Sequence, residues 1–495
     1  MCWYSVWPIT NMNFTSFTFL LFAGTLLVLY YNIPHRGQWL LLLVASYVFY
    51  LKSGIGNLFF ILLTSFTTYG ATRAMGRNQE VHDRKTAKQK NLKWVWACLG
   101  INFGMLAICK VRFTFQNILL PMGISFYMFQ SIGYVIDVYR GSIKAEQNLA
   151  KLALFVSFFP QLVQGPISKY SQLAPQLFSP HEFDGKQVSF GLQRMLWGYF
   201  KKLVIADRIS VAVTALKAPE HTGMSFFALT FFYAVQIYGD FTGGIDIAIG
   251  LSETLGIRLP ENFVRPFFSK NIAEYWRRWH ITLGEWMKEY VFYPVSVSSP
   301  MRKLNKAARK RWPKFGKRLP VYVASFVTWF CTGIWHGITP NFLLWGMMNC
   351  AVIVVSEELT PLYEKFHRRF QLKEKWWYGV FEITRMFLLM NLIRIVDLFP
   401  DVGEYFRRMG TMFSSFYVPF MELGLTALDY GILICGCVMV LSVSLIQEKY
   451  GSIRELLWEH RVLKYVLIFA LFLTVLLMGS YGIGYDPGNF IYNRF

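Results

Sequence analysis

A chain of 495 residues that is 54% hydrophobic and 18% aromatic, with only 16% charged residues, is too apolar for an ordinary soluble protein. Its formal net charge of +21 could indicate a nucleic-acid-binding protein, but the basic residues are concentrated in short segments between apolar runs. That distribution is typical of membrane topology signals, so we expect a lipid bilayer and no nucleic acid as partner.

The predicted elements are apolar runs, each long enough to span or enter a bilayer. They cover residues 14–31, 38–51, 57–72, 93–109, 117–139, 149–165, 188–215, 224–256, 320–338, 340–358, 377–399, 403–420, 429–446 and 463–481. Residues 158–166 and the segment around His280 are interrupted and look re-entrant. We therefore expect an all-α polytopic membrane protein with roughly 11 to 14 membrane elements.

The expected organisation is a single integral membrane domain over residues 1–495. Met12 offers an alternative start, which would make residues 1–11 an N-terminal addition. Basic clusters between the predicted spans should face the cytoplasm, and they lie at 73–93, 302–318, 365–375 and 449–464. This topology predicts a multi-pass protein of a bacterial-type cytoplasmic membrane, with the N-terminus and the tail 482–495 outside.

The motif from Gln236 to Asp246 places polar side chains in a run that is apolar on both sides. It also contains Tyr238 and Asp240. The two aspartates are six residues apart, so they lie on different helical faces and should not share a proton. We expect them to bind an arginine at 277 or 278, or a broken helix end, in preference to acting in catalysis, because carboxylates inside a membrane need such partners.

His280 lies in a segment that is too charged to span lipid and unusually aromatic for a loop. Its neighbours Arg277 and Arg278 either hold the segment at the lipid headgroups or bind the phosphates of an acyl donor. With Asp240 and Asn262 as expected neighbours, His280 would orient a substrate or donate a hydrogen bond to an oxyanion. A purely structural role is an equal alternative.

His336 follows Trp335 near the end of an apolar run that begins at Pro320. The 16 residues from Pro320 to Trp335 would climb roughly 24 Å as a helix, toward the outer half of the membrane. An unsatisfied polar group there costs about 2 to 7 kcal/mol, so a functional site is the default interpretation. An imidazole suits the task of a general base at neutral pH.

The seven cysteines show no spacing typical of metal ligands. Cys435 and Cys437 lie in an apolar run, where packing is the expected role. The sequence therefore predicts no disulfide, no metal site and no bound cofactor.

Taken together, these motifs resemble the membrane-bound O-acyltransferase family. The likeness rests on residues 236–250, 259–263, 276–286 and 333–337, with Arg394 and the closing residues 490–492. Within the family, the chain is similar to the bacterial branch that contains the alginate O-acetylation and teichoic-acid D-alanylation membrane proteins. Gly244 departs from the pattern where an aromatic residue is common, and Glu289 stands where an aspartate is usual.

The resemblance implies a helical bundle with a central tunnel that ends near the signature histidine, here His336. An acyl group, acetyl by preference, would pass from acetyl-CoA or an acyl carrier protein thioester to an extracellular polysaccharide hydroxyl. A secreted SGNH-esterase-like transferase is the expected protein partner. D-alanyl transfer to teichoic acid is the alternative, and a proton-coupled transporter or flippase is the alternative of another class, although the paired repeats typical of transporters are not evident.

Three of the last six residues are aromatic, which suggests that the tail docks in a groove. Tyr492 is either an interfacial anchor or, as the resemblance implies, a relay that accepts the acyl group as an ester. A phenol, with a pKa near about 10, is a better leaving group than a sugar alkoxide.

Overall fold

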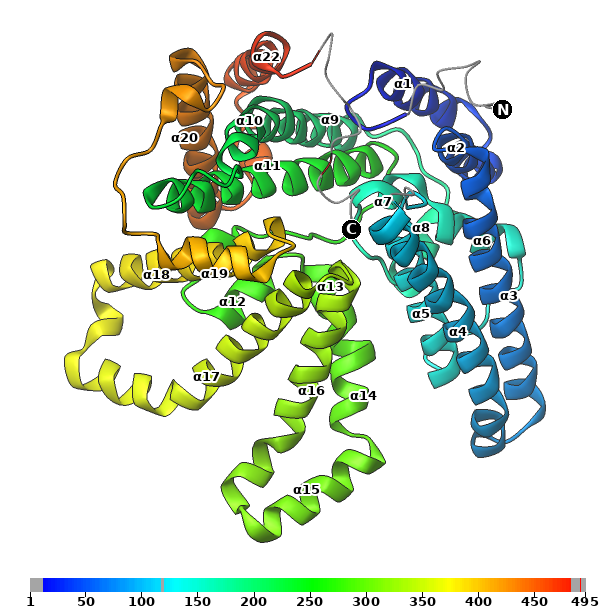
Figure 1. The fold of residues 1–495 in the computed structure, drawn as a ribbon. Coiled ribbons are helices and arrows are strands. Elements are labelled where there is room, and N and C mark those ends of the chain that lie inside the picture. Colours follow the sequence, from blue (N-terminus) through cyan, green and yellow to red (C-terminus); the bar gives the residue numbers. More distant parts are fainter. Residues whose placement is uncertain (1–11, 117–119, 482–489, 491–495) are drawn as a thin grey trace, which may run out of the picture. The chain divides into compact units, whose positions relative to one another are not determined.

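The computed structural model describes residues 12–116, 120–481 and 490. These residues are predominantly helical, and within them the isolated bridge between Phe263 and Trp279 is the one β contact (Figure 1). The chain divides into two compact units, which share the long helix α11 (Met224–Thr254). The all-α prediction is confirmed.

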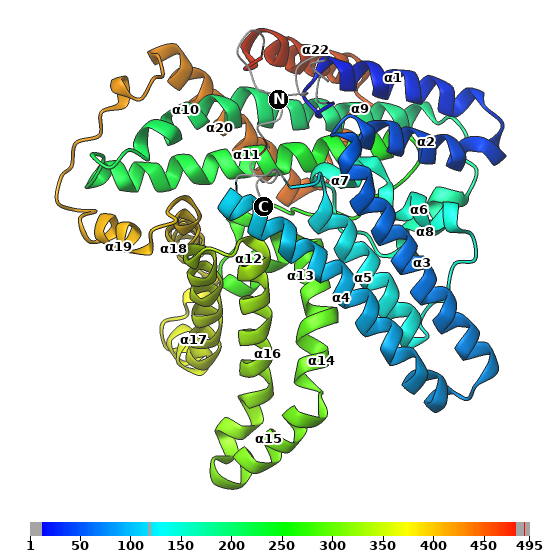
Figure 2. The same cartoon turned by 45° about the vertical axis from the view of Figure 1, so that its right-hand side comes forward.

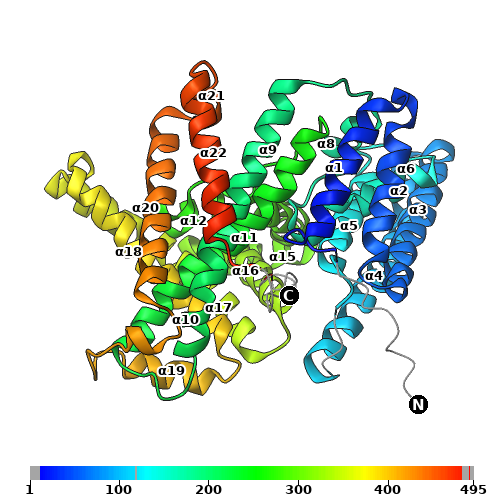
Figure 3. The same ribbon diagram turned by 90° about the horizontal axis from the view of Figure 1, so that it is seen from above.

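The first unit comprises residues 1–204, 239–260 and 452–494. Its helices are α1 (Phe17–Asn32), α2 (Gln38–Leu51), α3 (Leu58–Val81), α4 (Arg84–Gln116), α5 (Ile124–Arg140), α6 (Leu149–Ser157), α7 (Phe159–Gln164), α8 (Tyr170–Phe178), α9 (Gly185–Tyr199), the π-helical turn η3 (Phe200–Ala206), α21 (Ile453–Leu456) and α22 (Arg461–Met478). Helix α1 lies beside α2 (Figure 3), and α3, α4 and α5 pack against one another.

Glycines bring α9 and the second half of α11 into close backbone contact. A Cβ atom at Gly198 would lie 2.6 Å from the carbonyl oxygen of Gly243, and one at Gly191 would lie 2.5 Å from that of Gly250. The two glycines of each helix are seven residues apart, so they fall on one helical face. Small residues at such a crossing are typical of helix pairs packed within a membrane.

Gly198→Val is expected to destabilise the protein by roughly 1 to 3 kcal/mol or more, because its side chain would strike the backbone of α11. Thermal unfolding in detergent would measure the loss. Gly24→Ala on α1 is the matched control: a Cβ there meets nothing within 4 Å, so its melting temperature should not fall. Equal melting temperatures for Gly198→Val and the unmodified protein would contradict the close crossing.

The second unit comprises residues 205–238, 261–451 and 495. Its helices are α10 (Asp207–Leu216), α12 (Ile272–Arg278), α13 (Ile281–Met287), α14 (Tyr293–Ser296), α15 (Ser299–Arg311), α16 (Pro313–His336), α17 (Pro340–Phe370), α18 (Trp376–Arg394), α19 (Val402–Gly410) and α20 (Ala427–Tyr450). Helices α15 and α16 form a hairpin (Figure 2), and α16 packs against α17.

The basic segment 302–318, predicted to face the cytoplasm, is helical on both sides of a break at Trp312. Ser298 caps α15, its Oγ accepting a hydrogen bond from the backbone nitrogen of Met301, and Pro300 occupies the first turn. Lys, Arg and Ala are strong helix formers, so the composition that marks this segment as cytoplasmic also favours a helix. Exposed basic side chains still cover α15.

Four of the described helices are long and apolar enough to cross a membrane, namely α4, α17, α20 and α22. Their large apolar side chains include many exposed ones, such as Leu477, which is 75% exposed, and Ile434, which is 64% exposed. In a soluble protein such surfaces would be a liability, whereas in a bilayer they face lipid.

The run 403–420, expected to span or enter the membrane, contains only the nine-residue helix α19. Nine residues rise roughly 14 Å, which is too short to cross a bilayer. Arg408 holds this helix in place: it is fully buried, pairs with Glu404 at 2.6 Å and donates to the carbonyl oxygen of Lys217 at 2.7 Å. Of the two alternatives predicted for this run, crossing is excluded for α19 by its length, because hydropathy alone did not register this polar anchor.

Candidate active site

His280 occupies a break between two short helices of the second unit, α12 and α13. Its backbone is left-handed, with φ 46° and ψ 53°. Residues with a side chain adopt this conformation infrequently, and at a cost, and such strain is concentrated at functional sites. The conformation turns the chain after Trp279 and starts α13 at Ile281, so that the imidazole is buried.

Asn262 determines which nitrogen of His280 carries the proton. The Oδ1 atom of Asn262 accepts hydrogen bonds from the backbone nitrogen of Thr282 at 3.1 Å and from its hydroxyl at 3.0 Å, and it lies 3.2 Å from Nδ1 of His280. A backbone N–H can only donate, which fixes the amide oxygen toward this cluster. The Nδ1 atom must therefore donate, so Nε2 of neutral His280 bears the lone pair. The expected proximity of Asn262 and His280 is confirmed.

His336 is the last residue of α16, and the chain turns back after it into α17. Its ring lies 4.7 Å from that of Trp335 and 4.6 Å from that of Trp345, measured between centroids. Gly337 is required next to it, because a Cβ there would lie 2.1 Å from the ring of Phe342. The imidazole is thus held in an aromatic enclosure.

Trp335 connects the two histidines. Its ring centroid is 6.3 Å from that of His280 and 4.7 Å from that of His336. The structure therefore brings together His280, Asn262, Trp335 and His336, residues predicted for the site from segments that are far apart in the sequence.

Other predicted site residues of this unit are arranged around the same segment. Tyr238 on α11 packs its ring 5.0 Å from that of Phe267, and Gln236, two residues earlier on the same helix, is half-buried. Arg278 pairs with Glu274 at 2.9 Å and with Glu448 at 3.3 Å.

Arg277, unlike Arg278, is exposed and makes no ion pair with the described residues. It is therefore the arginine of this segment that remains available to an anionic group of lipid or substrate.

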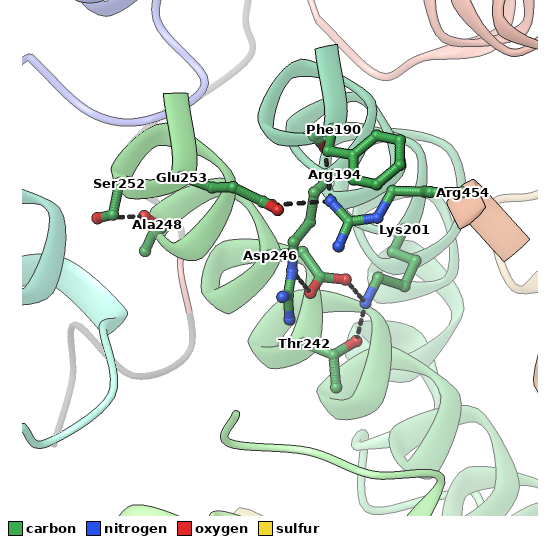
Figure 4. Close-up of polar contacts among 9 residues, drawn as sticks. All are labelled: Phe190, Arg194, Lys201, Thr242, Asp246, Ala248, Ser252, Glu253 and Arg454. Carbon is green, nitrogen blue, oxygen red and sulfur yellow. Dashed lines mark hydrogen bonds and ion pairs between the residues drawn. The ribbon is translucent and has the colours of Figure 1, made fainter. Parts of the chain in front are cut away.

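The carboxylates of α11 have partners that sequence reasoning missed. Asp240 pairs with Lys202 at 2.6 Å, where both side chains are buried. Asp246 pairs with Lys201 at 2.6 Å and with Arg194 at 2.9 Å (Figure 4). These cations on η3 and α9 replace the arginines at 277 and 278 that we expected. The missed signal was the adjacent lysine pair inside the apolar run 188–215.

Lys201 and Lys202 lie in the π-helical turn η3, from which their side chains reach the carboxylates of α11. Such turns are rare, and in helices they frequently accompany functional sites. Further along the same helix pair, Arg454 pairs with Glu253 at 2.8 Å and donates to the carbonyl oxygen of Phe190 (Figure 4). Each of these three carboxylates of α11 in the first unit is thus neutralised, which fits a structural role for Asp240.

Tyr492 lies outside the described residues. Phe490, two residues earlier, is fully buried in the first unit. Its ring lies 4.2 Å from Nζ of Lys202 and 6.5 Å, in an edge arrangement, from the ring of Phe14.

Comparison with known proteins matches the sequence profile of the membrane-bound O-acyltransferase family to residues 143–309 and 310–396. The chain is 36% identical to the probable alginate O-acetylase of Pseudomonas fluorescens over 358 residues, which cover 70% of this chain and 67% of that protein. It is 30% identical to the peptidoglycan O-acetyltransferase of Helicobacter pylori over 295 residues, covering 54% of this chain and 52% of that protein.

A third relative is the teichoic acid D-alanyltransferase of Bacillus subtilis, which is 27% identical over 262 residues. That alignment covers 52% of this chain and 62% of the relative. The aligned parts thus span about half to two thirds of the length of these relatives.

Proposed function

The chain belongs to the membrane-bound O-acyltransferase family, and from that premise we propose that it transfers an acetyl group from a cytoplasmic thioester to a hydroxyl of an extracellular polysaccharide. The observation that carries this proposal is the convergence of His280, Trp335 and His336 in one buried cluster. Two imidazoles kept in an aromatic enclosure at membrane depth suit proton transfer away from bulk water.

In the proposed reaction, His336 takes the proton of the acceptor hydroxyl while the hydroxyl oxygen attacks the thioester carbonyl. The resulting oxyanion collapses and breaks the carbon–sulfur bond. The departing thiolate takes the proton back from His336, so that an ester and a free thiol leave the site.

The tautomer of His280 supports a role in orienting the acceptor. Its Nδ1–H points to Asn262, so the other nitrogen of the neutral ring accepts hydrogen bonds. A neutral His280 would therefore accept a hydrogen bond from a second hydroxyl of the acceptor, which leaves the proton of the attacking hydroxyl to His336. This favours a role of His280 in orienting the acceptor over the alternative of donating a hydrogen bond to the oxyanion.

The experiment that tests the proposal is turnover of radiolabelled acetyl-CoA by the purified protein in proteoliposomes. Thioester cleavage supports the enzyme, whereas substrate uptake without loss of the acyl group would support a transporter. Turnover of a D-alanyl carrier-protein thioester, with acetyl-CoA left intact, would favour the D-alanylating alternative that the Bacillus subtilis relative suggests.

The proposed topology places α15 in the cytoplasm. In a cysteine-free background, Lys310→Cys should resist a membrane-impermeant maleimide added to intact cells and should react after permeabilisation. Phe416→Cys is the control: residue 416 is 77% exposed and precedes α20, whose other end enters a basic cluster, so it should react from outside. Rapid external labelling at residue 310 would overturn the orientation.

For the tail, we propose that Tyr492 accepts the acyl group as an ester and passes it to a secreted SGNH-esterase-like transferase. Tyr492→Phe keeps the ring and removes only the hydroxyl, so it should abolish polymer acylation while protein levels stay normal. Mass spectrometry of the wild-type tail should show the added acyl group. Unchanged polymer acylation in Tyr492→Phe would make the residue an anchor and return the acceptor role to the polymer or a partner.

A further inference from the structure

Three polar side chains lie at every third position where α18 passes into the 3₁₀ turn η7 (Ile395–Leu398). They are Asn391, Arg394 and Asp397, spaced three residues apart. That spacing puts them on one face, since residues i and i+3 are neighbours on a helix and eclipse one another in a 3₁₀ turn. Asn391 and Arg394 are only 3% and 4% exposed.

Arg394 connects this face to the His280 segment. Its guanidinium carbon lies 3.6 Å from the ring centroid of Trp279, the residue before His280, and its Nη2 donates to the hydroxyl oxygen of Tyr275. The stack on Trp279 fixes the plane of the guanidinium.

Asn341 connects the same face to the His336 turn. Its Nδ2 donates to the carbonyl oxygens of Val396 and Asp397, at 3.3 Å each, and the hydroxyl of Thr339 donates to its Oδ1 at 2.6 Å. Asn341 stands five residues after His336, at the start of α17. The polar face is therefore tied to both histidine segments.

Three buried atoms of this face have no hydrogen-bond partner among the described residues: Nδ2 of Asn391, Nη1 of Arg394 and Oδ1 of Asp397. Arg394 and Asp397 also form no ion pair in the described part of the chain, although they are one turn apart. Leaving buried polar groups unpaired costs about 1 to 3 kcal/mol each, more when they are charged. Such groups in a native protein call for a ligand or solvent that satisfies them.

We propose that Asn391, Arg394 and Asp397 form a subsite that binds neighbouring hydroxyl groups of the carbohydrate acceptor. Two donors and one acceptor match a pair of hydroxyls, each of which both accepts and donates. A simple anion would be repelled by Asp397 and a simple cation by Arg394. The inference rests on the proposed function and names the site of its acceptor.

The direction of α18 indicates that the ligand of this subsite is the acceptor and not the acyl donor. This helix begins just after the basic cluster 365–375, which the topology places in the cytoplasm. Its 19 residues rise roughly 28 Å, which carries Arg394 to the outer half of the membrane, where the polysaccharide arrives.

The test measures acyl transfer from acetyl-CoA to a mannuronate tetrasaccharide by purified protein, with separate KM values for donor and acceptor. Arg394→Met and Asp397→Asn should raise the acceptor KM by roughly 10- to 100-fold, as expected for the loss of a hydrogen bond to a charged group. The donor KM and the slow acceptor-free loss of thioester are measured alongside, and a rise confined to the acceptor KM supports the subsite. Arg385→Met, at an exposed arginine of the same helix, is the matched control and should behave as wild type.

Tyr275→Phe separates binding from a structural role. It removes the hydroxyl that Arg394 contacts but leaves Nη1 in place, so the acceptor KM should change by less than about threefold if Nη1 binds the sugar. An acceptor KM that stays at the wild-type value in both Arg394→Met and Asp397→Asn would overturn the subsite. So would a loss of kcat and of acceptor-free thioester cleavage without any KM change, because that pattern would indicate displacement of Trp279 and His280.

Failure of the subsite is distinguishable from failure of the proposed function. A wild-type protein that cleaves acetyl-CoA without a saturable response to the tetrasaccharide overturns the subsite and leaves the acyltransferase in place. A protein that cleaves no acyl thioester overturns the proposed function itself.

Discussion

His336→Ala should lower acyl transfer by a factor of roughly 10² to 10⁴ while the protein remains folded. The reason is that a hydroxyl near neutral pH is a weak nucleophile and needs a positioned base, and His336 is the imidazole that the end of α16 holds against Trp335 and Trp345. The measurement is release of free thiol from acetyl-CoA in proteoliposomes, together with polymer acylation in cells at matched expression.

His460→Ala is the matched control, since that residue is an exposed histidine far along the chain and should retain wild-type turnover. His336→Gln adds a second comparison, because it keeps a polar side chain in the aromatic enclosure but cannot act as a base. Turnover near the wild-type rate in His336→Ala or His336→Gln would remove His336 from the chemistry and make it a packing residue.

Lys202→Met should destabilise the protein by about 3 to 5 kcal/mol, the largest stability loss that we expect. It leaves the carboxylate of Asp240 buried without its cation, and Lys202 and Asp240 have side chains only 1% and 3% exposed. The double variant Lys202→Met/Asp240→Leu should recover most of the loss, because replacing both charges by apolar groups removes the unpaired charge. Thermal unfolding in detergent measures the stability loss of the single variant and its recovery in the double variant.

The matched control is Lys186→Met, which breaks the pair with Glu455. That pair has side chains 42% and 58% exposed, so its loss should cost no more than about 1 kcal/mol. Two results would contradict the buried-pair explanation. One is a melting temperature of Lys202→Met equal to that of the Lys186→Met control, and the other is a double variant less stable than Lys202→Met alone.

Several features were predictable because they depend on residue type and local order. The apolar runs indicated an all-helical membrane protein, since a backbone in lipid must satisfy its own hydrogen bonds. The apolar run predicted over 320–338 ends within two residues of His336, where α16 ends. Hydropathy did not predict how short the helix within 403–420 is, nor the buried contacts of Arg408 with the carbonyl oxygen of Lys217.

The sequence by itself determined the membrane setting, the helical class and the family, because hydropathy and ordered motifs are properties of the chain before it folds. Only the tertiary structure decided which side chains pair with one another. Lys202 neutralises Asp240 from 38 residues away, and Asn262 sets the tautomer of His280 across a helix break. Arg394 reaches Trp279 from more than 100 residues away. Pairings of this kind depend on which helical faces meet and at what register, and neither periodicity nor composition encodes that choice.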